Sequence, residues 1–240
     1  MQLVRFTAVC WILVSVLVLP QGARFGISLS GNYTTSSKVY PTPYSSDLSL
    51  RNGFYPLDDF YNPSAEIFWN ISPDLELGLS FEYMRVTADN RFVTVFDGFV
   101  TRSLRVTDGF ELYPIELNLY YRLPFSLDDW GFYIYGGAGL YPASFVREMG
   151  SAELKTVDQQ SGYGIQVGVS GDYVAYKNLL ITYGMKFRDP QVLLKSGYVS
   201  EEFTYNNRQY KVGQSEFDSK INVDGVVFMM GVRYNFMVNF

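Results

Sequence analysis

The chain has 240 residues, which suits one domain, and it is 48% hydrophobic, 18% aromatic and 18% charged. Its formal net charge of −5 excludes the basic footprint of a nucleic-acid-binding protein. The mean hydropathy is close to zero and the chain has only one long apolar run, which argues against a helical membrane protein.

That apolar run lies at the N-terminus, where residues 1–23 are predicted to be a secretory signal peptide. Arg5 gives a positive start, residues 6–19 are apolar, and cleavage is expected after Ala23. The alternative is an uncleaved anchor helix, but the run is shorter than the ~20 residues that cross a bilayer. The single cysteine, Cys10, lies in this segment, so the mature chain is expected to contain no disulfide. Residues 24–240 are then expected to form one β-barrel domain.

After the leader the dominant pattern is alternation with a period of two, which predicts strands with two different faces. In residues 75–83, for example, Leu77 and Leu79 alternate with Glu76 and Gly78. Eight such strands are predicted, at residues 25–33, 64–71, 75–83, 115–123, 132–143, 163–173, 179–187 and 225–236.

The connections between these strands alternate strictly in length. Four are long, at about residues 35–62, 87–108, 146–160 and 189–222, and the three between them are short. An up-and-down transmembrane barrel with both ends in the periplasm has this parity. Within the long loops, Asp97-Gly98 and Asn206-Asn207 predict two-residue hairpin turns. An alternative counts residues 91–96 as a spanning strand and gives ten strands, although about six residues fall short of the ~9–11 that cross.

The polar faces of the strands are predicted to point into the barrel. Eight strands leave an interior that side chains just fill, and buried charges need partners. Acidic residues come mainly from strands two to four and basic residues from strands seven and eight, so ion pairs are expected across the lumen. The predicted lumen network consists of Glu66, Glu76, Glu82, Glu116, Arg122, Lys186, Arg188 and Arg233. We expect it to plug the barrel; the alternative is a thin polar conduit.

Aromatic residues mark the strand ends and the C-terminus. Trp69, Trp130 and Tyr173 lie near the short turns, as in the aromatic girdles of membrane barrels. The last strand contains Gly231, Tyr234 and Phe236 in a Gly-x-x-aromatic-x-aromatic pattern, and a further aromatic residue, Phe240, ends the chain. This pattern resembles the signal by which the barrel assembly machinery recognises outer-membrane proteins.

With this signal, the mature chain resembles in architecture the small outer-membrane barrels of the OmpX, OmpW and OmpA-barrel type. The resemblance implies roles in adhesion, envelope integrity, stress survival or passage of small hydrophobic compounds. An OmpW-like protein would add a hydrophobic lumen with a side exit, which the charged inner face of this chain fits poorly.

The absence of histidine argues against catalysis. A Ser-His triad and imidazole metal ligands are impossible, and the mature chain has no nucleophilic cysteine. Adjacent carboxylates such as Asp58-Asp59 are expected to be solvated loop charge. No catalytic, cofactor or metal site is therefore predicted.

The fold class predicted from the sequence is all-β: an eight-stranded antiparallel transmembrane β-barrel in the bacterial outer membrane. The chain is expected to be a monomer with lipids and the assembly machinery as partners. Its function is predicted to be envelope integrity or surface interaction, with an extracellular ligand bound at the loops. The alternatives are a narrow channel and a periplasmic lipocalin-like binding barrel.

Overall fold

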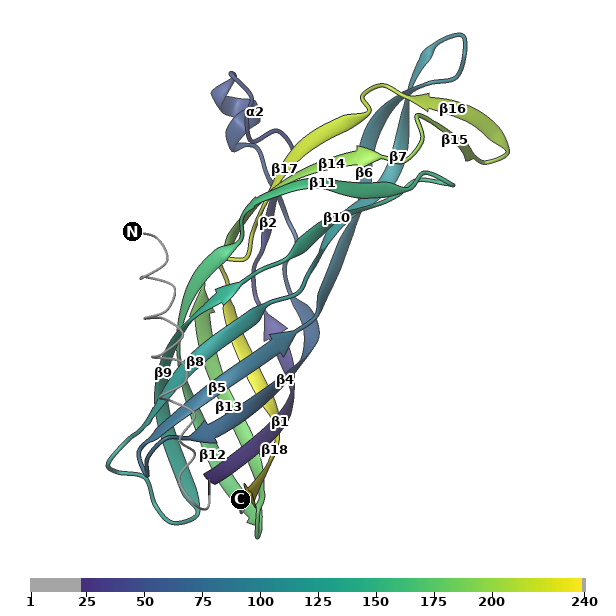
Figure 1. Cartoon of the computed structure of the whole chain (residues 1–240). Helices are drawn as coiled ribbons and strands as arrows, with labels where there is room; N and C mark the ends of the chain where they lie inside the picture. Colours follow the sequence, from purple (N-terminus) through teal and green to yellow (C-terminus); the bar gives the residue numbers. More distant parts are fainter. Residues whose placement is uncertain (1–22, 239–240) are drawn as a thin grey trace, which may run out of the picture.

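The computed structural model describes residues 23–238, so residues 1–22 of the predicted signal peptide and Phe240 lie outside the described residues, and Ala23 begins the first strand. Eight strands close into an antiparallel barrel in which each strand pairs with the next barrel strand and the last pairs with the first (Figure 1). They are β1 (Ala23–Thr34), β4 (Phe60–Asn70), β5 (Leu75–Glu82), β8 (Ile115–Arg122), β9 (Trp130–Leu140), β12 (Tyr163–Tyr176), β13 (Leu179–Arg188) and β18 (Val226–Val238). The eight-stranded prediction is confirmed, and the ten-strand alternative is wrong.

Both ends of the described chain lie at one end of the barrel, because Ala23 and Val238 are register partners. The short turns lie at this same end, which we call the short-turn end (Figure 1). The strand predicted at residues 132–143 instead ends at Leu140. Pro142 has no N–H to donate to a ladder, and the side chain of Tyr141 is fully buried where the chain leaves the barrel wall.

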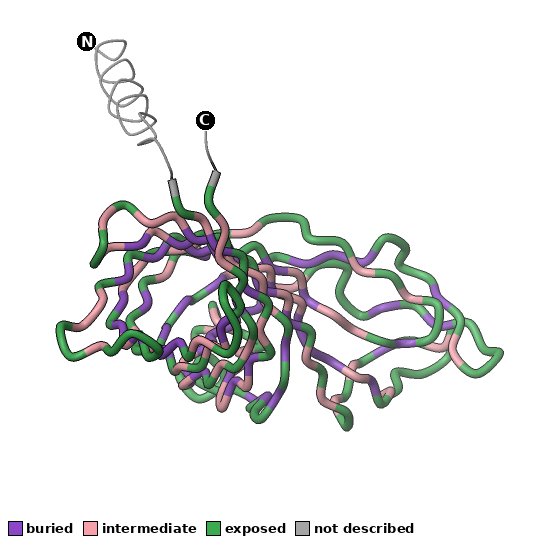
Figure 2. Tube along the Cα trace, turned by 90° about the horizontal axis from the view of Figure 1, so that it is seen from below, coloured by how far each residue is buried: buried purple, intermediate pink, exposed green. Residues whose placement is uncertain are grey.

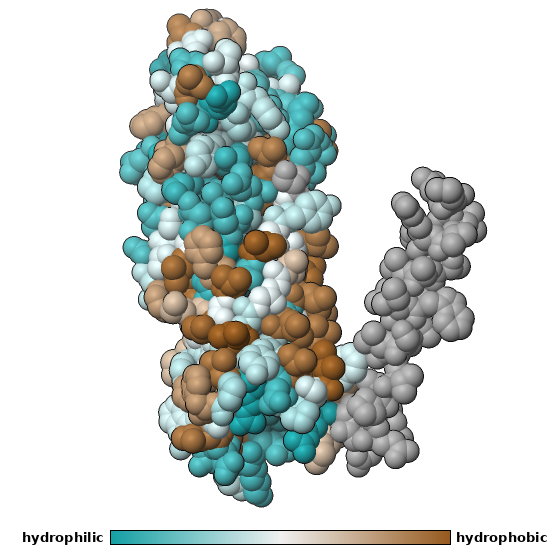
Figure 3. All heavy atoms as spheres, turned by 90° about the vertical axis from the view of Figure 1, so that its left-hand side faces the viewer, coloured by the Kyte–Doolittle hydropathy of each residue, from teal (hydrophilic) through white to brown (hydrophobic). Residues whose placement is uncertain are grey.

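The barrel exposes apolar side chains and buries polar ones. Burial alternates along its strands, as Figure 2 shows in a view from below. The outward positions include Leu29, Ile67, Leu79, Leu117, Val167, Met185 and Val232, each of which is exposed. Figure 3 shows apolar residues concentrated on the barrel, with hydrophilic residues predominating above. A barrel with this surface is stable only in an apolar surrounding, so the lipocalin-like alternative is wrong.

At the other end, the chain continues into two five-stranded sheets, which together we call the extension. One sheet has the order β10-β7-β6-β16-β15 and the other β11-β14-β17-β2-β3 (Figure 1). The first contains β6 (Met84–Phe96), β7 (Thr101–Leu112), β10 (Ala143–Glu148), β15 (Glu202–Tyr205) and β16 (Arg208–Val212). The second contains β2 (Lys38–Tyr40), β3 (Tyr55–Pro56), β11 (Leu154–Ser161), β14 (Gln191–Tyr198) and β17 (Glu216–Asn222), and a short helix, α2 (Leu48–Asn52), lies between β2 and β3. The sequence predicted two hairpins here but not the two sheets.

One of the two predicted hairpin turns is confirmed. Asn206 and Asn207 join β15 to β16 with φ of 49° and 61°, the positive angles of a type I′ turn. The prediction of a two-residue turn at Asp97-Gly98 is wrong, because Phe96 pairs with Thr101 and leaves four residues in the loop. The Asp97 carboxylate accepts hydrogen bonds from the N–H groups of Phe99 and Val100, at 3.0 and 2.9 Å, and this favours the wider turn.

The Asp97 turn gives a pH prediction. Hydrogen bonds from the Val100 and Phe99 N–H groups and from Arg102 lower the pKa of Asp97 from 3.8 to about 2. Because the folded-state pKa lies below the unfolded value, the carboxylate stabilises the turn fully above pH ~4, and this contribution is lost as pH falls through about 2. A carboxyl NMR titration should place the Asp97 midpoint near pH 2. A midpoint at the ordinary value of 3.8 would contradict the hydrogen-bonded turn.

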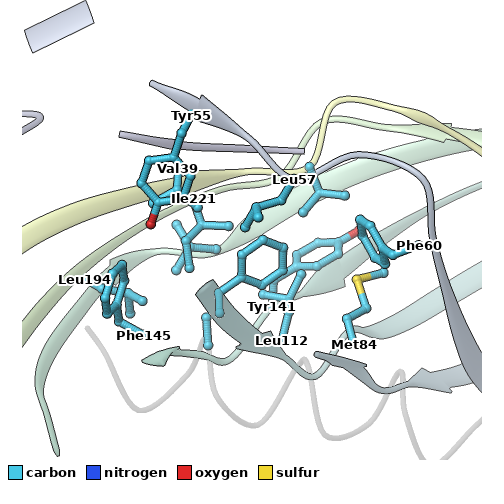
Figure 4. Packing of buried hydrophobic residues seen from close by; sticks show 14 residues of the cluster. Val39, Tyr55, Leu57, Phe60, Met84, Leu112, Tyr141, Phe145, Leu194 and Ile221 are labelled. Atoms are coloured by element: carbon cyan, nitrogen blue, oxygen red, sulfur yellow. The ribbon is translucent and has the colours of Figure 1, made fainter. Parts of the chain in front are cut away.

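Two apolar clusters lie between the sheets of the extension. The proximal core, next to the barrel, draws on both sheets and appears in close-up in Figure 4. It consists of Val39, Tyr55, Leu57, Phe60, Met84, Phe110, Leu112, Tyr141, Ala143, Phe145, Val192, Leu194, Ile221 and Val223. The distal core consists of Val95, Val106, Met149, Tyr198, Phe203, Tyr210 and Val212. The extension is therefore a packed two-sheet body rather than a set of loose loops.

A partly buried arginine, Arg147, links the two sheets. Arg147 on β10 makes a two-pronged ion pair with Asp108 on β7, with contacts of 2.7 and 2.6 Å. Its third nitrogen donates to the Tyr198 hydroxyl on the opposite sheet at 2.9 Å. Its guanidinium also lies 4.7 Å from the ring centre of Phe217 on that sheet.

Two adjacent glycines in β9 give a matched pair for mutation. A Cβ on Gly137 would lie 2.2 Å from the Leu117 carbonyl and 2.4 Å from the Asn118 amide oxygen, whereas one on Gly136 meets nothing nearer than 3.6 Å. We expect Gly137→Ala to destabilise the barrel by about 1–3 kcal/mol through overpacking, and Gly136→Ala to be nearly neutral. Urea unfolding of the refolded variants measures the difference. Equal stabilities would contradict this packing.

Candidate functional site

The lumen near the extension holds four buried charges, Glu82, Glu116, Lys186 and Arg188, which we call the upper ion cluster. The Arg188 guanidinium lies 2.7 Å from Glu82 and 3.1 Å from Glu116. The Lys186 ammonium lies 3.1 Å from Glu82 and 2.8 Å from Glu116. Each cation therefore bridges both carboxylates. Strands β5 and β8 supply the acids and β13 supplies the bases, so the cluster ties opposite walls together.

Further side chains complete the hydrogen bonding of this cluster. Glu116 accepts from the Tyr141 hydroxyl at 2.8 Å and from Ser80 at 3.3 Å. Glu82 accepts from the Asn62 amide. A buried ion cluster is stable only when its remaining lone pairs are satisfied in this way.

A second group of charges, the lower ion cluster, lies toward the short-turn end. The Arg233 guanidinium contacts Glu76 at 2.8 Å and Asp172 at 3.3 Å. It also lies 4.0 Å from the centre of the Phe68 ring. Asn70 donates to Glu76 at 2.9 Å. All three charged side chains are buried, so the lumen is crossed at two levels.

Between the two clusters the lumen is filled mainly by neutral side chains. Glu66 accepts hydrogen bonds from the Tyr120 hydroxyl at 2.9 Å and the Asn118 amide at 3.2 Å. The rings of Tyr120 and Tyr135 stack with their centroids 4.5 Å apart. A cavity of about 40 Å³ remains between Glu66 and Arg233, which is room for a few water molecules at most.

The lumen differs at its two ends. At the short-turn end it opens into a polar cavity of about 690 Å³, whose lining includes Arg24, Arg122 and Lys177. At the other end the proximal core covers the upper ion cluster, since Met84 and Tyr141 of that core contact Arg188 and Glu116. The geometry is a blind vestibule below two ion clusters and an apolar cover.

Seven of the eight predicted lumen residues lie in the two ion clusters or between them. The eighth, Arg122, lies at the vestibule. There the Arg122 guanidinium donates to the Leu127 carbonyl at 3.0 Å, and it makes no salt bridge within residues 23–238. Sequence reasoning missed Asp172 in the network. It lies two residues after Ser170 on the polar face of β12, so continuing the alternation would have found it.

Gly231, Tyr234 and Phe236 of the predicted assembly signal lie on β18, whereas Phe240 lies outside the described residues. Gly231 pairs with Ser30 and Thr182, Tyr234 is 54% exposed on the outer surface, and Phe236 stacks on Phe25 with a centroid distance of 6.0 Å. Near the short turns, Trp130 packs against Tyr173 at 4.6 Å. These aromatic residues line the barrel rim, where an apolar belt meets polar surroundings.

A closed eight-stranded barrel with an apolar outer belt, a charged lumen and short turns at one end defines the class of small outer-membrane β-barrels. No protein-family model and no curated protein matches this sequence. Among solved structures the chain is similar to the outer-membrane protein OprG of Pseudomonas aeruginosa, at 17% identity and a TM-score of 0.53, over 90% of this chain and 97% of that one. This likeness shows the shared fold.

Two further solved structures show weaker similarity. Neisserial surface protein A is 14% identical with a TM-score of 0.45, over 88% of this chain and 97% of that one. Ail, the attachment invasion locus protein of Yersinia pestis, is 11% identical with a TM-score of 0.40, over 90% and 99%.

Proposed function

We propose that this protein is a non-enzymatic outer-membrane barrel that is closed to solutes and presents its extension outside the cell for surface interaction. The single observation that carries the proposal is the seal over the lumen. The upper ion cluster crosses the barrel, and the proximal core covers it. A solute entering from the vestibule would have to break both.

The extension supports a role in surface interaction. It is a packed body with two cores and an inter-sheet ion pair, and functional contacts of membrane barrels are commonly made by loops on a rigid scaffold. In the proposed orientation the short turns face the periplasm and the extension faces the medium. The same rigid wall would also support envelope integrity.

The non-enzymatic part of the proposal rests on the available chemistry. The sequence has no histidine, and the buried carboxylates Glu76, Glu82 and Glu116 are engaged with cations. Among residues 23–238, no three His, Cys, Asp or Glu side chains gather as a metal-binding group. No helix in these residues is long and apolar enough to cross a membrane.

Export and insertion complete the proposal. The N-terminal segment would direct secretion and be removed, and the barrel assembly machinery would recognise the aromatic last strand, in which Tyr234 and Phe236 face outward. The chain would then work as a monomer surrounded by outer-membrane lipid.

Planar-bilayer recording tests the closed lumen. We expect the refolded protein to give no steady single-channel current, because both ion clusters would have to separate before ions pass. Heat-modifiable gel migration of the same sample confirms that the barrel has folded, and a general porin in the same bilayer provides the positive control. Reproducible current steps that scale with salt concentration would overturn the plug and favour the channel alternative.

A further inference from the structure

We propose that two apolar projections at the far end of the extension insert into the surface of an apposed phospholipid bilayer. This inference rests on the proposed function, because it needs the extension to face outward. The hairpin projection is residues 92–105 at the end of β6 and β7. The helix projection is residues 44–54, which contain α2.

The hairpin projection holds aromatic rings in solvent on an ordered turn. Phe99 is 92% exposed and Phe92 is 68% exposed. The Asp97 carboxylate accepts hydrogen bonds from the N–H groups of Phe99 and Val100, and Asp97 also pairs with Arg102. The rings are therefore displayed by a fixed turn rather than by a loose one, and burying them elsewhere would cost little conformational entropy.

The helix projection, on the other sheet, also holds exposed apolar side chains on an ordered segment. None of the five residues of α2 is buried, and the Asp47 side chain caps the helix by accepting from the Ser49 N–H at 2.8 Å. Four large apolar side chains on this projection are at least half exposed, namely Tyr44, Leu48, Leu50 and Phe54.

Both projections lie at the end of the molecule away from the short turns, as Figure 1 shows for α2 and for the loop between β6 and β7. The 13 residues of β6, at about 3.3 Å each, carry the hairpin roughly 40 Å along the strand from the barrel. Because the projections come from different sheets, they form two separate points of attachment. A bilayer is broad and deformable enough to receive both points at once.

The charges of the projections fit phosphate headgroups. Asp97 and Asp47 are the acidic residues of the two segments, and their carboxylates accept hydrogen bonds from backbone N–H groups. Arg105, the register partner of Phe92, and Arg51, next to Leu50, are exposed and make no salt bridge within the described part of the chain. Apolar side chains beside arginine suit the membrane interface, where the rings enter the acyl boundary and the guanidinium meets phosphate.

Liposome flotation tests the proposal with the full chain held in nanodiscs. We expect the protein to float with phosphatidylcholine vesicles, and more strongly when phosphatidylglycerol is added. Phe99→Ser and Leu48→Ser should each lower binding about tenfold, since each removes a large apolar side chain that would be buried in the lipid. The control is Phe125→Ser, because Phe125 is 66% exposed but lies in a turn at the opposite end. Arg105→Gln should remove part of the gain from phosphatidylglycerol.

A second measurement reports insertion directly. Tryptophan introduced by Phe99→Trp should be quenched by brominated lipid in the added vesicles, whereas one introduced by Phe125→Trp should not. Absence of flotation, or equal flotation of wild type and Phe99→Ser/Leu48→Ser, would overturn the inference. A folded, non-conducting protein that fails to float would leave the proposed closed barrel intact, whereas a steady current would overturn that function whatever the vesicles show.

Discussion

Replacing Arg188 with leucine should lower the free energy of unfolding by about 3–5 kcal/mol. The Arg188 side chain is fully buried and contacts Glu82 and Glu116 at 2.7 and 3.1 Å. Without it, these two carboxylates share only Lys186, and a buried charge is left uncompensated. Equilibrium unfolding in urea, with the protein refolded in detergent micelles, measures the loss.

Two further variants show whether this loss comes from the unpaired charge. Arg188→Leu combined with Glu82→Leu should recover much of the stability, because apolar residues can replace a buried ion pair at little cost. Arg85→Leu provides the exposed control: Arg85 contacts Glu111 and Glu148 but its side chain is 48% exposed, so the change should stay within about 1 kcal/mol. Equal losses for Arg188→Leu and Arg85→Leu would contradict the role of the upper ion cluster.

Truncating Phe110 to alanine should destabilise the extension by about 3–5 kcal/mol. Phe110 is completely buried in the proximal core, where its ring meets Phe60 edge-on at 6.4 Å. The cavity left behind would lie between the two sheets, within the proximal core that covers the lumen. Hydrogen exchange should therefore rise first in the extension, while the barrel strands remain protected.

The matched control for Phe110 is Phe92→Ala, which removes the same side chain from an exposed position of the same sheet. Its effect on unfolding should be within about 0.5 kcal/mol. If the two variants exchange alike, the extension is not held by its core and the rigid scaffold for surface interaction is lost.

The barrel could be predicted because each strand faces lipid on one side and the packed lumen on the other, so that apolar and polar residues alternate along it with a period of two. On β5, for example, Leu77 and Leu79 alternate with Glu76 and Gly78. The charge bias of the strands was equally informative, since Lys186 and Arg188 do face Glu82 and Glu116 across the lumen.

The extension could not be predicted because water solvates its outer face and its inner face mixes apolar with polar residues. On β14, for instance, Leu194 and Tyr198 are buried on either side of Ser196, which is also buried. Partners far apart in the chain, such as β2 with β17, leave no local sequence signal. The Asp97 turn was misjudged because the hydrogen bonds of the side chain, rather than the glycine, select its length.

The sequence separation of the lumen charges has a consequence for assembly. Glu76, Glu82 and Glu116 lie on β5 and β8, whereas Lys186, Arg188 and Arg233 lie on β13 and β18, and the Arg188–Glu82 contact spans 106 residues. A partly assembled sheet that lacks β13 and β18 therefore carries these acidic side chains without their neutralising cations. Closing the ring and neutralising these carboxylates are the same event, so the barrel should form cooperatively rather than through a stable open sheet.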